Sequence, residues 1–288
     1  MLANLLNSLQ EDAMPGKIIS QRPVAIVTGA SSGIGEALAG CFAAAGHDLV
    51  LVARSADKLR TIAASLARQH GVAATVQAAD LSQPGAAAAL GAALGRKRRL
   101  PDVLVNCAGV LEYGSFTGMT AQTHQQIIDL NISGLTAMIS EFLPGMVARA
   151  GPGGGLQARI LNVASIAAFQ PVPMLATYAA SKAYVLSLTE SLSEELKGTG
   201  VTVTALCPGI TATNMLSTAA SANGSLGRIP GFLIGDVNAV ARQAFEACMR
   251  GDAICVPGVV NRAAMIASRS TPKWLVRKLG GLVGRSSV

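Results

Sequence analysis

The sequence has few charged and few aromatic residues. Only 14% of its 288 residues are charged and 3% are aromatic, whereas half are apolar. This balance excludes an intrinsically disordered chain, which would be rich in charge and poor in apolar residues. It also requires a core built mainly from alanine, valine, leucine and isoleucine. At about 150 residues per domain, the length allows one large domain or two small ones.

Long apolar runs and paired cysteine motifs are also absent. No apolar run reaches the roughly 18 residues that a membrane-spanning helix needs, and the opening residues lack the basic segment of a signal peptide. The five cysteines show neither a CxxC pair nor a metal-binding spacing, so we expect no metal site and a reducing compartment. These absences predict a cytoplasmic globular protein.

The net charge of +7 is concentrated in two places. Six cations and one acid lie from Gly251 onward, which puts +5 in the last 38 residues. The second cluster, Arg96-Lys97-Arg98-Arg99, has no interleaved aromatic residues on which nucleic-acid bases could stack. We therefore expect residues 96–99 to form a solvated loop and expect no nucleic-acid partner.

Short β-branched runs alternate with helical stretches along the chain. The predicted strands are Val24–Thr28, Leu49–Ala53, Val72–Ala78, Val103–Asn106, Ile160–Ala164, Val201–Cys207 and Ala253–Val256. The helices expected between them include Gly35–Ala45, Ala56–Gln69, Ala121–Arg149, Tyr178–Lys197 and Val237–Arg250. Apolar strands that alternate with helices indicate a parallel sheet covered on both faces. The prediction is a single α/β domain with a Rossmann-like, doubly wound parallel sheet of about seven strands.

This pattern occupies residues 23–260, and a flanking segment lies on each side of it. Residues 1–22 are expected to form an N-terminal extension. Residues 261–288 are expected to form a basic amphipathic tail, because Leu275, Leu279 and Leu282 fall on one helical stripe. The tail either docks on its own fold or on a neighbouring subunit, or it makes peripheral contact with an anionic membrane.

A glycine-rich turn follows the first strand and opens a helix. Its sequence is TGASSGIG, from Thr28 to Gly35. Glycines allow the backbone to turn tightly and to approach a pyrophosphate, whose charge faces the helix N-terminus. The spacing TGxxxGxG differs from the more usual GxGxxG. Its position between a strand and a helix predicts a dinucleotide-binding site.

Further motifs follow this turn in order. They are Asp80-Leu81 after the third strand, Asn106-Cys107-Ala108-Gly109 after the fourth, Asn131 in the next helix, Ser165 after the fifth strand, Tyr178-Ala-Ala-Ser-Lys182, and Pro208-Gly209 after the sixth. Together with the glycine-rich turn, they resemble the short-chain dehydrogenase/reductase family, in its branch with a YxxxK active site. One departure is Cys107, where the family usually has a second asparagine.

The candidate catalytic residues are Asn131, Ser165, Tyr178 and Lys182. Tyr178 and Lys182 lie four residues apart, on one face of a helix, and a nearby ammonium is expected to lower the pKa of a phenol toward the neutral range. Ser165 could hydrogen-bond the same substrate oxygen. The resemblance further implies that Lys182 holds the nicotinamide ribose and that Asn131 holds a water linking Lys182 to solvent.

The end of the second strand bears on the choice of cofactor. An acid there would accept a hydrogen bond from the ribose 2′-hydroxyl of NAD, but Arg54 stands there, and a cation pairs with the 2′-phosphate of NADP. We expect NADP(H) to be favoured over NAD(H), the alternative being that Arg54 only caps the strand. The expected cofactor-binding residues are Gly29, Ser31, Ser32, Gly33, Ile34, Gly35, Arg54, Ser55, Asp80, Leu81, Asn106, Ala108, Gly109, Tyr178, Lys182, Pro208, Gly209, Thr211 and Thr213.

Substrate specificity is expected from residues 111–119, 166–173 and 208–233. No lysine or arginine occurs from Ile210 to Gly227 to bind a carboxylate, so an apolar ketone or aldehyde is expected. The predicted function is an NADPH-dependent carbonyl reductase with Tyr178 as general acid/base. The alternative is a catalytically idle NADP-binding sensor or scaffold. The resemblance also implies a homodimer or homotetramer, paired through the helices that carry Asn131 and Tyr178.

Overall fold

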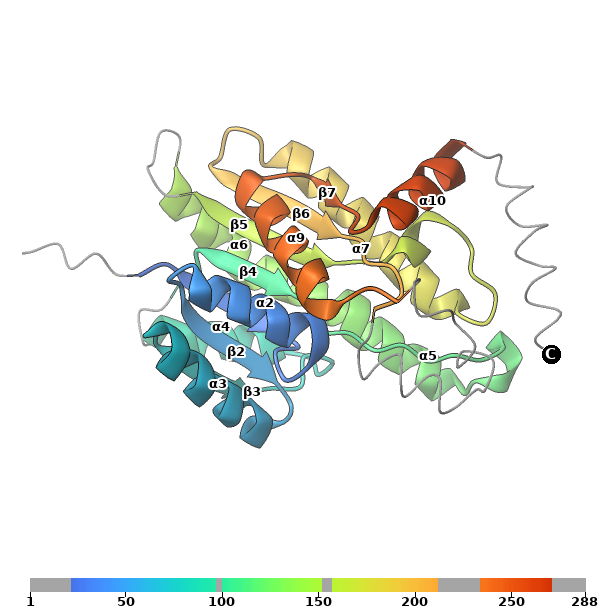
Figure 1. Cartoon of the computed structure of the whole chain (residues 1–288). Coiled ribbons are helices and arrows are strands. Elements are labelled where there is room, and N and C mark those ends of the chain that lie inside the picture. Colours follow the sequence, from blue (N-terminus) through green and yellow to red (C-terminus); the bar gives the residue numbers. More distant parts are fainter. Residues whose placement is uncertain (1–21, 97–99, 152–156, 212–233, 271–288) are drawn as a thin grey trace, which may run out of the picture.

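A computed structural model of the chain describes residues 22–96, 100–151, 157–211 and 234–270. In this part of the chain, seven strands form one parallel sheet in the order β3-β2-β1-β4-β5-β6-β7 (Figure 1). The strands are β1 (Val24–Thr28), β2 (Asp48–Ala53), β3 (Ala74–Ala78), β4 (Val103–Asn106), β5 (Ala158–Val163), β6 (Val201–Leu206) and β7 (Ile254–Cys255). The predicted α/β class and seven-stranded parallel sheet are therefore confirmed.

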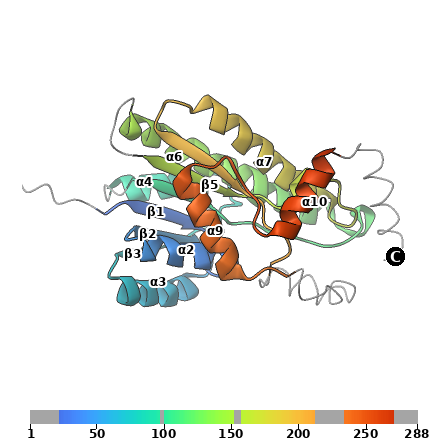
Figure 2. The same ribbon diagram turned by 45° about the horizontal axis from the view of Figure 1, so that its top comes forward.

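Helices cover both faces of the sheet (Figures 1 and 2). One face packs against α2 (Gly33–Ala44), α3 (Ala56–His70) and α9 (Val237–Arg250). The other packs against α4 (Ala86–Arg96), α6 (Leu135–Ala150) and α7 (Ala176–Glu195). The remaining described helices are α5 (Ala121–Ile128), which leads toward α6, and α10 (Val259–Ser270), which follows β7.

Successive residues of each central strand enter different cores. In β1, Ala25 and Val27 belong to the core under α2, α3 and α9, whereas Ile26 belongs to the core under α4, α6 and α7. Side chains alternate across a strand, so a strand buried on both faces must be apolar throughout. This explains why the sequence shows continuous apolar runs and not an apolar–polar alternation.

Several elements differ from the expected bounds by one or two residues, and three differences bear on the fold. The helix expected over Ala121–Arg149 is divided, because a π-helical turn, η2 (Asp129–Gly134), separates α5 from α6. The third strand begins at Ala74 and not at Val72, since Gly71 ends α3 in the left-handed conformation. Helix α10 spans the position, between residues 260 and 261, where the fold was expected to give way to the tail.

The sheet order places β1 between β2 and β4, so the chain reverses its winding direction between β1 and β4. In doubly wound sheets, ligands bind at this switch point, beyond the carboxyl ends of the strands. None of the described helices is long and apolar enough to cross a membrane. Among the described residues, no cluster of three or more His, Cys, Asp or Glu side chains could hold a metal ion.

Candidate active site

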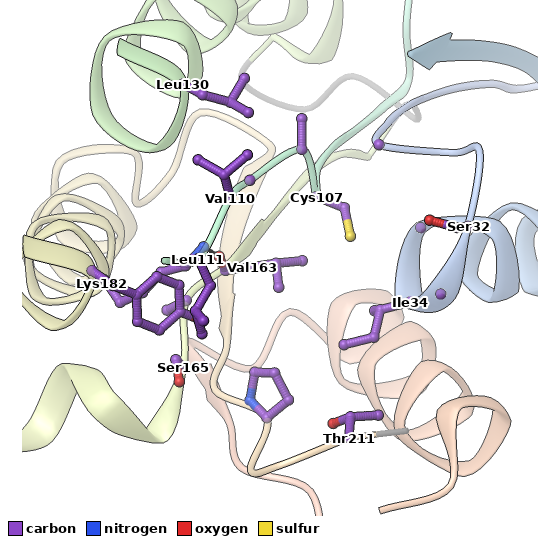
Figure 3. Close-up of a pocket in the computed structure, with 18 of the residues that line it drawn as sticks. Ser32, Ile34, Cys107, Val110, Leu111, Leu130, Val163, Ser165, Lys182 and Thr211 are labelled. Atoms are coloured by element: carbon purple, nitrogen blue, oxygen red, sulfur yellow. Dashed lines mark hydrogen bonds between the residues drawn. The ribbon is translucent and has the colours of Figure 1, made fainter. Parts of the chain in front are cut away.

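A cavity of about 540 Å³ lies at the switch point. Its lining comes from the ends of β2 and β5, from the loops that follow β1 to β6, and from α2, η2 and α7. Figure 3 shows Ser32 and Ile34 on one side of this cavity and Ser165 and Lys182 on the other. We call the first the cofactor side and the second the substrate side, after the roles that the sequence predicts for their residues.

On the cofactor side, glycines bring backbone against backbone. A Cβ atom on Gly35 would lie 2.4 Å from the carbonyl oxygen of Gly29, and one on Gly29 would lie 2.9 Å from the amide nitrogen of Ala108. Gly29 also has a φ of 67°, which L side chains rarely adopt. The side chain of Ser32, the N-cap of α2, makes no capping hydrogen bond. Amides in the first turn of a helix lack intrahelical partners, which suits them to bind phosphate.

Thr28 fastens this turn to the neighbouring strand. Its hydroxyl donates to the carbonyl oxygen of Val105 at 3.1 Å and accepts from the amides of Cys107 and Ala108 at 2.9 and 3.0 Å. One buried side chain therefore joins the ends of β1 and β4. The sequence motif includes Thr28, but its spacing does not reveal this role.

Arg54 follows β2 and lines the cavity beside Ser55 and Asp80. A hydrogen bond from the Ser82 hydroxyl lowers the pKa of Asp80 most, and the positive charge of Arg54 lowers it further. Arg54 is exposed and follows the second strand, the part of the fold where doubly wound dinucleotide-binding proteins contact the cofactor ribose. Planar guanidinium groups bind phosphate well through two parallel hydrogen bonds.

The candidate catalytic side chains meet at the start of α7. Tyr178 and Lys182 lie on successive turns of this helix. Ser165 is the second residue after β5, and its hydroxyl accepts from the amide of Ala167. Tyr178 and Ser165 share a hydrogen bond. The Lys182 ammonium donates to the carbonyl oxygen of Val163 at 2.9 Å and lies 5.7 Å from the centre of the Tyr178 ring.

Burial controls the ionisation of these two groups. It raises the pKa of Tyr178, an effect that the hydrogen bond with Ser165 only partly offsets. It lowers the pKa of Lys182 to about 8. The expected lowering of the phenol pKa by the ammonium is therefore not found, because desolvation is the larger effect and the ammonium is directed at Val163. Tyr178 consequently stays protonated at neutral pH, as a proton donor must.

Asn131 lies in the π-helical turn and is only 1% exposed. Its side chain accepts from the amide of Val110 at 2.9 Å and donates to the carbonyl oxygen of Val110 and to the hydroxyl of Ser181, both at 3.0 Å. Ser181 in turn donates to the carbonyl oxygen of Tyr178 at 2.7 Å. Asn131 therefore connects the segment after β4 to the helix that carries Tyr178 and Lys182.

The substrate side is lined mainly by apolar groups. Leu111 and Tyr113 come from the segment after β4, and Val172 and Leu175 come from the segment before α7. Leu111, Val172 and Leu175 also pack against the buried cluster of Ala167, Tyr178 and Ala179. Such a wall favours an apolar substituent next to the reacting group. The predicted segments 111–119 and 166–173 thus both contribute to the lining, whereas 212–233 lies outside the described residues.

A model of the short chain dehydrogenase family matches residues 23–224. The chain belongs to this family. It is 40% identical over 196 residues, or 67% of this chain and 72% of the relative, to a putative ketoacyl reductase of the monensin polyketide synthase from Streptomyces virginiae. A solved short-chain dehydrogenase from Sphingobium yanoikuyae, in complex with NADPH, superposes with a TM-score of 0.75 at 32% identity, covering 86% of this chain and 93% of that one.

Some curated relatives of this short-chain dehydrogenase are much longer. The probable oxidoreductase EphD of Mycobacterium tuberculosis is 33% identical over 192 residues, which is 67% of this chain but 31% of that protein. The chain thus spans about a third of that relative. The predicted family and its NAD(P)-binding Rossmann-like fold are confirmed by these matches together with the sheet.

The cavity of this short-chain dehydrogenase gathers most of the predicted site residues. Asn131 and Asn106 do not line it, Thr213 lies outside the described residues, and the others line it. The Asn106 amide instead donates to the Asn162 side chain at 2.9 Å, and Asn162 donates to Thr189 at 3.0 Å. Asn106 therefore ties β4 to β5 and α7 within the fold. Sequence reasoning missed Ser181, although its place three residues after Tyr178 puts it one helical turn away.

Proposed function

We propose that this chain is an NADP(H)-dependent carbonyl reductase, which interconverts an apolar ketone or aldehyde and the corresponding alcohol by hydride transfer. The observation that carries the proposal is the buried group formed by Ser165, Tyr178 and Lys182, across one cavity from a glycine-rich turn. A nucleotide-binding protein without chemistry has no need of a protonated phenol hydrogen-bonded to a serine at the inner wall of its site.

The side chains present suit the two ends of such a cofactor. Gly29 and Gly35 leave no Cβ atom where backbone segments meet, and the start of α2 offers amides to a pyrophosphate. Arg54 would bind the 2′-phosphate of NADP, and the similarity to a short-chain dehydrogenase in complex with NADPH agrees with this preference. When bound, the cofactor supplies the hydride.

Tyr178 supplies the proton in the direction of carbonyl reduction. Its raised pKa keeps the phenol protonated, and Ser165 is placed to hydrogen-bond the same substrate oxygen. As the proton leaves, negative charge develops on the phenol oxygen. Lys182, with a pKa of about 8, remains mostly charged at neutral pH and stabilises that developing charge. In the oxidative direction the same groups act in reverse.

The proposal includes a homodimer or homotetramer with pairing through α7 and the helix that carries Asn131. Small residues on α7, among them Ala180, Ser187 and Ser191, are exposed and would allow a second helix to approach closely. Light scattering would test this, since a single species near the 29.2 kDa of one chain would contradict it. Cytoplasmic location and membrane contact of the tail stay predictions from the sequence.

The decisive experiment is a substrate panel. The purified protein is mixed with NADPH and a series of ketones and aldehydes, including ketoacyl thioesters, and the loss of NADPH absorbance is followed. We expect turnover with apolar carbonyls and about a thousandfold less with the Tyr178→Phe variant under the same conditions. Tight NADPH binding without turnover of any carbonyl would overturn the proposal in favour of the sensor or scaffold.

A further inference from the structure

The first turn of α7 carries Thr177 and Tyr178 but has no cap of its own. Leu175 occupies the N-cap position, and no side chain caps the turn there. The initial amides of a helix have no intrahelical partners, so an uncapped end frays more readily. Tyr178 must nevertheless keep its hydrogen bond with Ser165. Contacts from elsewhere in the molecule have to hold this turn in place.

His124, on α5, supplies one such contact. Its Nδ1 atom lies 2.7 Å from the hydroxyl oxygen of Thr177, and its Nε2 atom lies 3.2 Å from the carbonyl oxygen of Phe116. A carbonyl oxygen only accepts, so Nε2 carries the proton, and in the neutral ring Nδ1 accepts from the Thr177 hydroxyl. The imidazole also stacks on the Phe116 ring, with centroids 4.3 Å apart.

A second contact joins the same two segments nearby. The amide of Gly114 donates to the carbonyl oxygen of Met174 at 2.9 Å. Met174 has a φ of 68°, a left-handed conformation that is strained for a residue with a Cβ atom. Such strain persists only where surrounding contacts hold the backbone. The segments 111–119 and 172–177 are thus tied at two points.

The residues next to these ties line the cavity. Leu111 and Tyr113 precede Gly114 in one segment, and Val172 and Leu175 flank Met174 in the other. The distance between the two segments therefore sets the space open to the carbonyl substituents. A histidine with no structural role on the surface of α5 would not contact two other segments through both ring nitrogens and one face of its ring.

We propose that His124 is a positioning residue for this reaction. Its contacts with Thr177 and with the loop that carries Phe116, together called the clasp, hold the first turn of α7 and therefore Tyr178 in place. They also fix the width of the substrate side. The inference rests on the proposed function for its kinetic consequences. The clasp itself is a statement about structure and is tested without turnover.

The kinetic test compares four variants with a matched control. His124→Ala removes the ring, Thr177→Val removes only the hydroxyl, the double variant removes both, and Thr177→Ser restores the hydroxyl. We expect the first two to lower kcat about tenfold, the double variant to be no worse than His124→Ala, and Thr177→Ser to stay within about twofold of the unmodified protein. The control is Thr123→Val, which removes a hydroxyl paired with Thr120 on the same helix and leaves the clasp intact.

Two readouts separate positioning from a general loss of structure. The Kd for NADPH should stay within about twofold in every variant, because the clasp touches only the substrate side. The ratio of kcat/KM for a bulky ketone to that for a small one should rise in His124→Ala and in Thr177→Val but not in Thr123→Val. Losses that add in the double variant, or equal behaviour of Thr177→Val and Thr177→Ser, would overturn the proposal.

Amide hydrogen exchange, measured by mass spectrometry, decides the clasp independently of activity. We expect faster exchange in peptides covering residues 111–119 and 174–180 in His124→Ala, to the same extent in the double variant and not in Thr123→Val. Unchanged exchange in both segments would refute the clasp. If the unmodified protein reduces no carbonyl, the proposed function fails, but the exchange experiment still confirms or refutes the contact.

Discussion

On the cofactor side of the cavity, the closest contacts at Gly29 and Gly35 are between backbone atoms. On the substrate side, the His124 side chain joins two segments that share one backbone hydrogen bond, at Met174. Gly29 and Gly35 admit no Cβ atom without a clash. His124 and Thr177, by contrast, meet through a single hydrogen bond across 53 positions of the chain. A substitution changes a side chain but leaves the backbone atoms in place, so contacts between side chains can change from one sequence to another more easily than contacts between backbone atoms. The first side is therefore constrained to one geometry, and the second can be varied for different substrates.

The largest expected effect is on turnover, in variants of the catalytic residues Tyr178 and Lys182 between the two sides. Tyr178→Phe should lower turnover by about a thousandfold, because the proton donor is removed, yet leave the Kd for NADPH within a few-fold. Lys182→Ala should lower turnover and also weaken NADPH binding, since the resemblance gives its ammonium a role toward the phenol and toward the ribose. Steady-state kinetics and NADPH fluorescence titration measure the two quantities. Equal loss of NADPH binding in the two variants would contradict these separate roles.

The next effect tests the close backbone contacts on the cofactor side. Gly35→Ala places a Cβ atom against the Gly29 carbonyl, and we expect it to lower the free energy of unfolding by about 1–3 kcal/mol and to weaken NADPH binding. The matched control is Gly40→Ala on the same helix, where a Cβ atom meets nothing within 4 Å. The free energy of unfolding of Gly40→Ala should rise by up to about 1 kcal/mol, because alanine favours a helix more than glycine does. The free energy of unfolding of both variants is measured with denaturant. Equal values for Gly35→Ala and Gly40→Ala would contradict the close backbone contact at Gly35.

A smaller effect is expected from a charge at the rim of the cofactor side. The unmodified protein should prefer NADPH over NADH by about tenfold or more, the value of one charged contact. Arg54→Asp should erase or invert this preference, since the acid repels the 2′-phosphate and accepts from the 2′-hydroxyl. Equal kcat/KM values for the two cofactors in the unmodified protein would rule out this role for Arg54.

The smallest expected effect is a pH dependence. Burial lowers the pKa of Lys182 to about 8, so its ammonium is present below that pH and is lost above it. The kcat/KM for NADPH, which reports the free enzyme, should therefore fall about fourfold between pH 7 and pH 8.5. The raised pKa of Tyr178 keeps the phenol protonated over this range. A profile that is flat up to pH 9.5 would show that Lys182 does not titrate as its burial implies.

The same contrast explains what could be predicted from the sequence. The glycine-rich turn is visible in the sequence, and so are the apolar runs of the buried strands. The close backbone contacts and the sheet were therefore predicted nearly residue by residue. The clasp was missed because neither His124 nor Thr177 belongs to a motif and only the folded chain brings them together. Asn106 was assigned to the cofactor because it opens a cavity-lining motif. Its amide is instead directed at Asn162 on the neighbouring strand.

The π-helical turn was missed for a related reason. A sequence pattern does not distinguish a continuous α-helix from one that carries a single wider turn. What the wider turn provides is visible only in three dimensions, where Asn131 reaches both Val110 and Ser181. Such turns are often found at functional sites.

The strand order has a consequence for how the protein is made. β1 pairs with β2 on one edge, but its other edge pairs with β4, which begins at Val103 and is synthesised only after the 102 residues that precede it. Until then, an apolar strand edge is open to wrong partners on other chains. The glycine-rich turn is also incomplete, because Thr28 finds its acceptor and donors on the far side of that gap. A fragment that ends before β4 would carry the whole nucleotide motif and still lack the strand that fixes it.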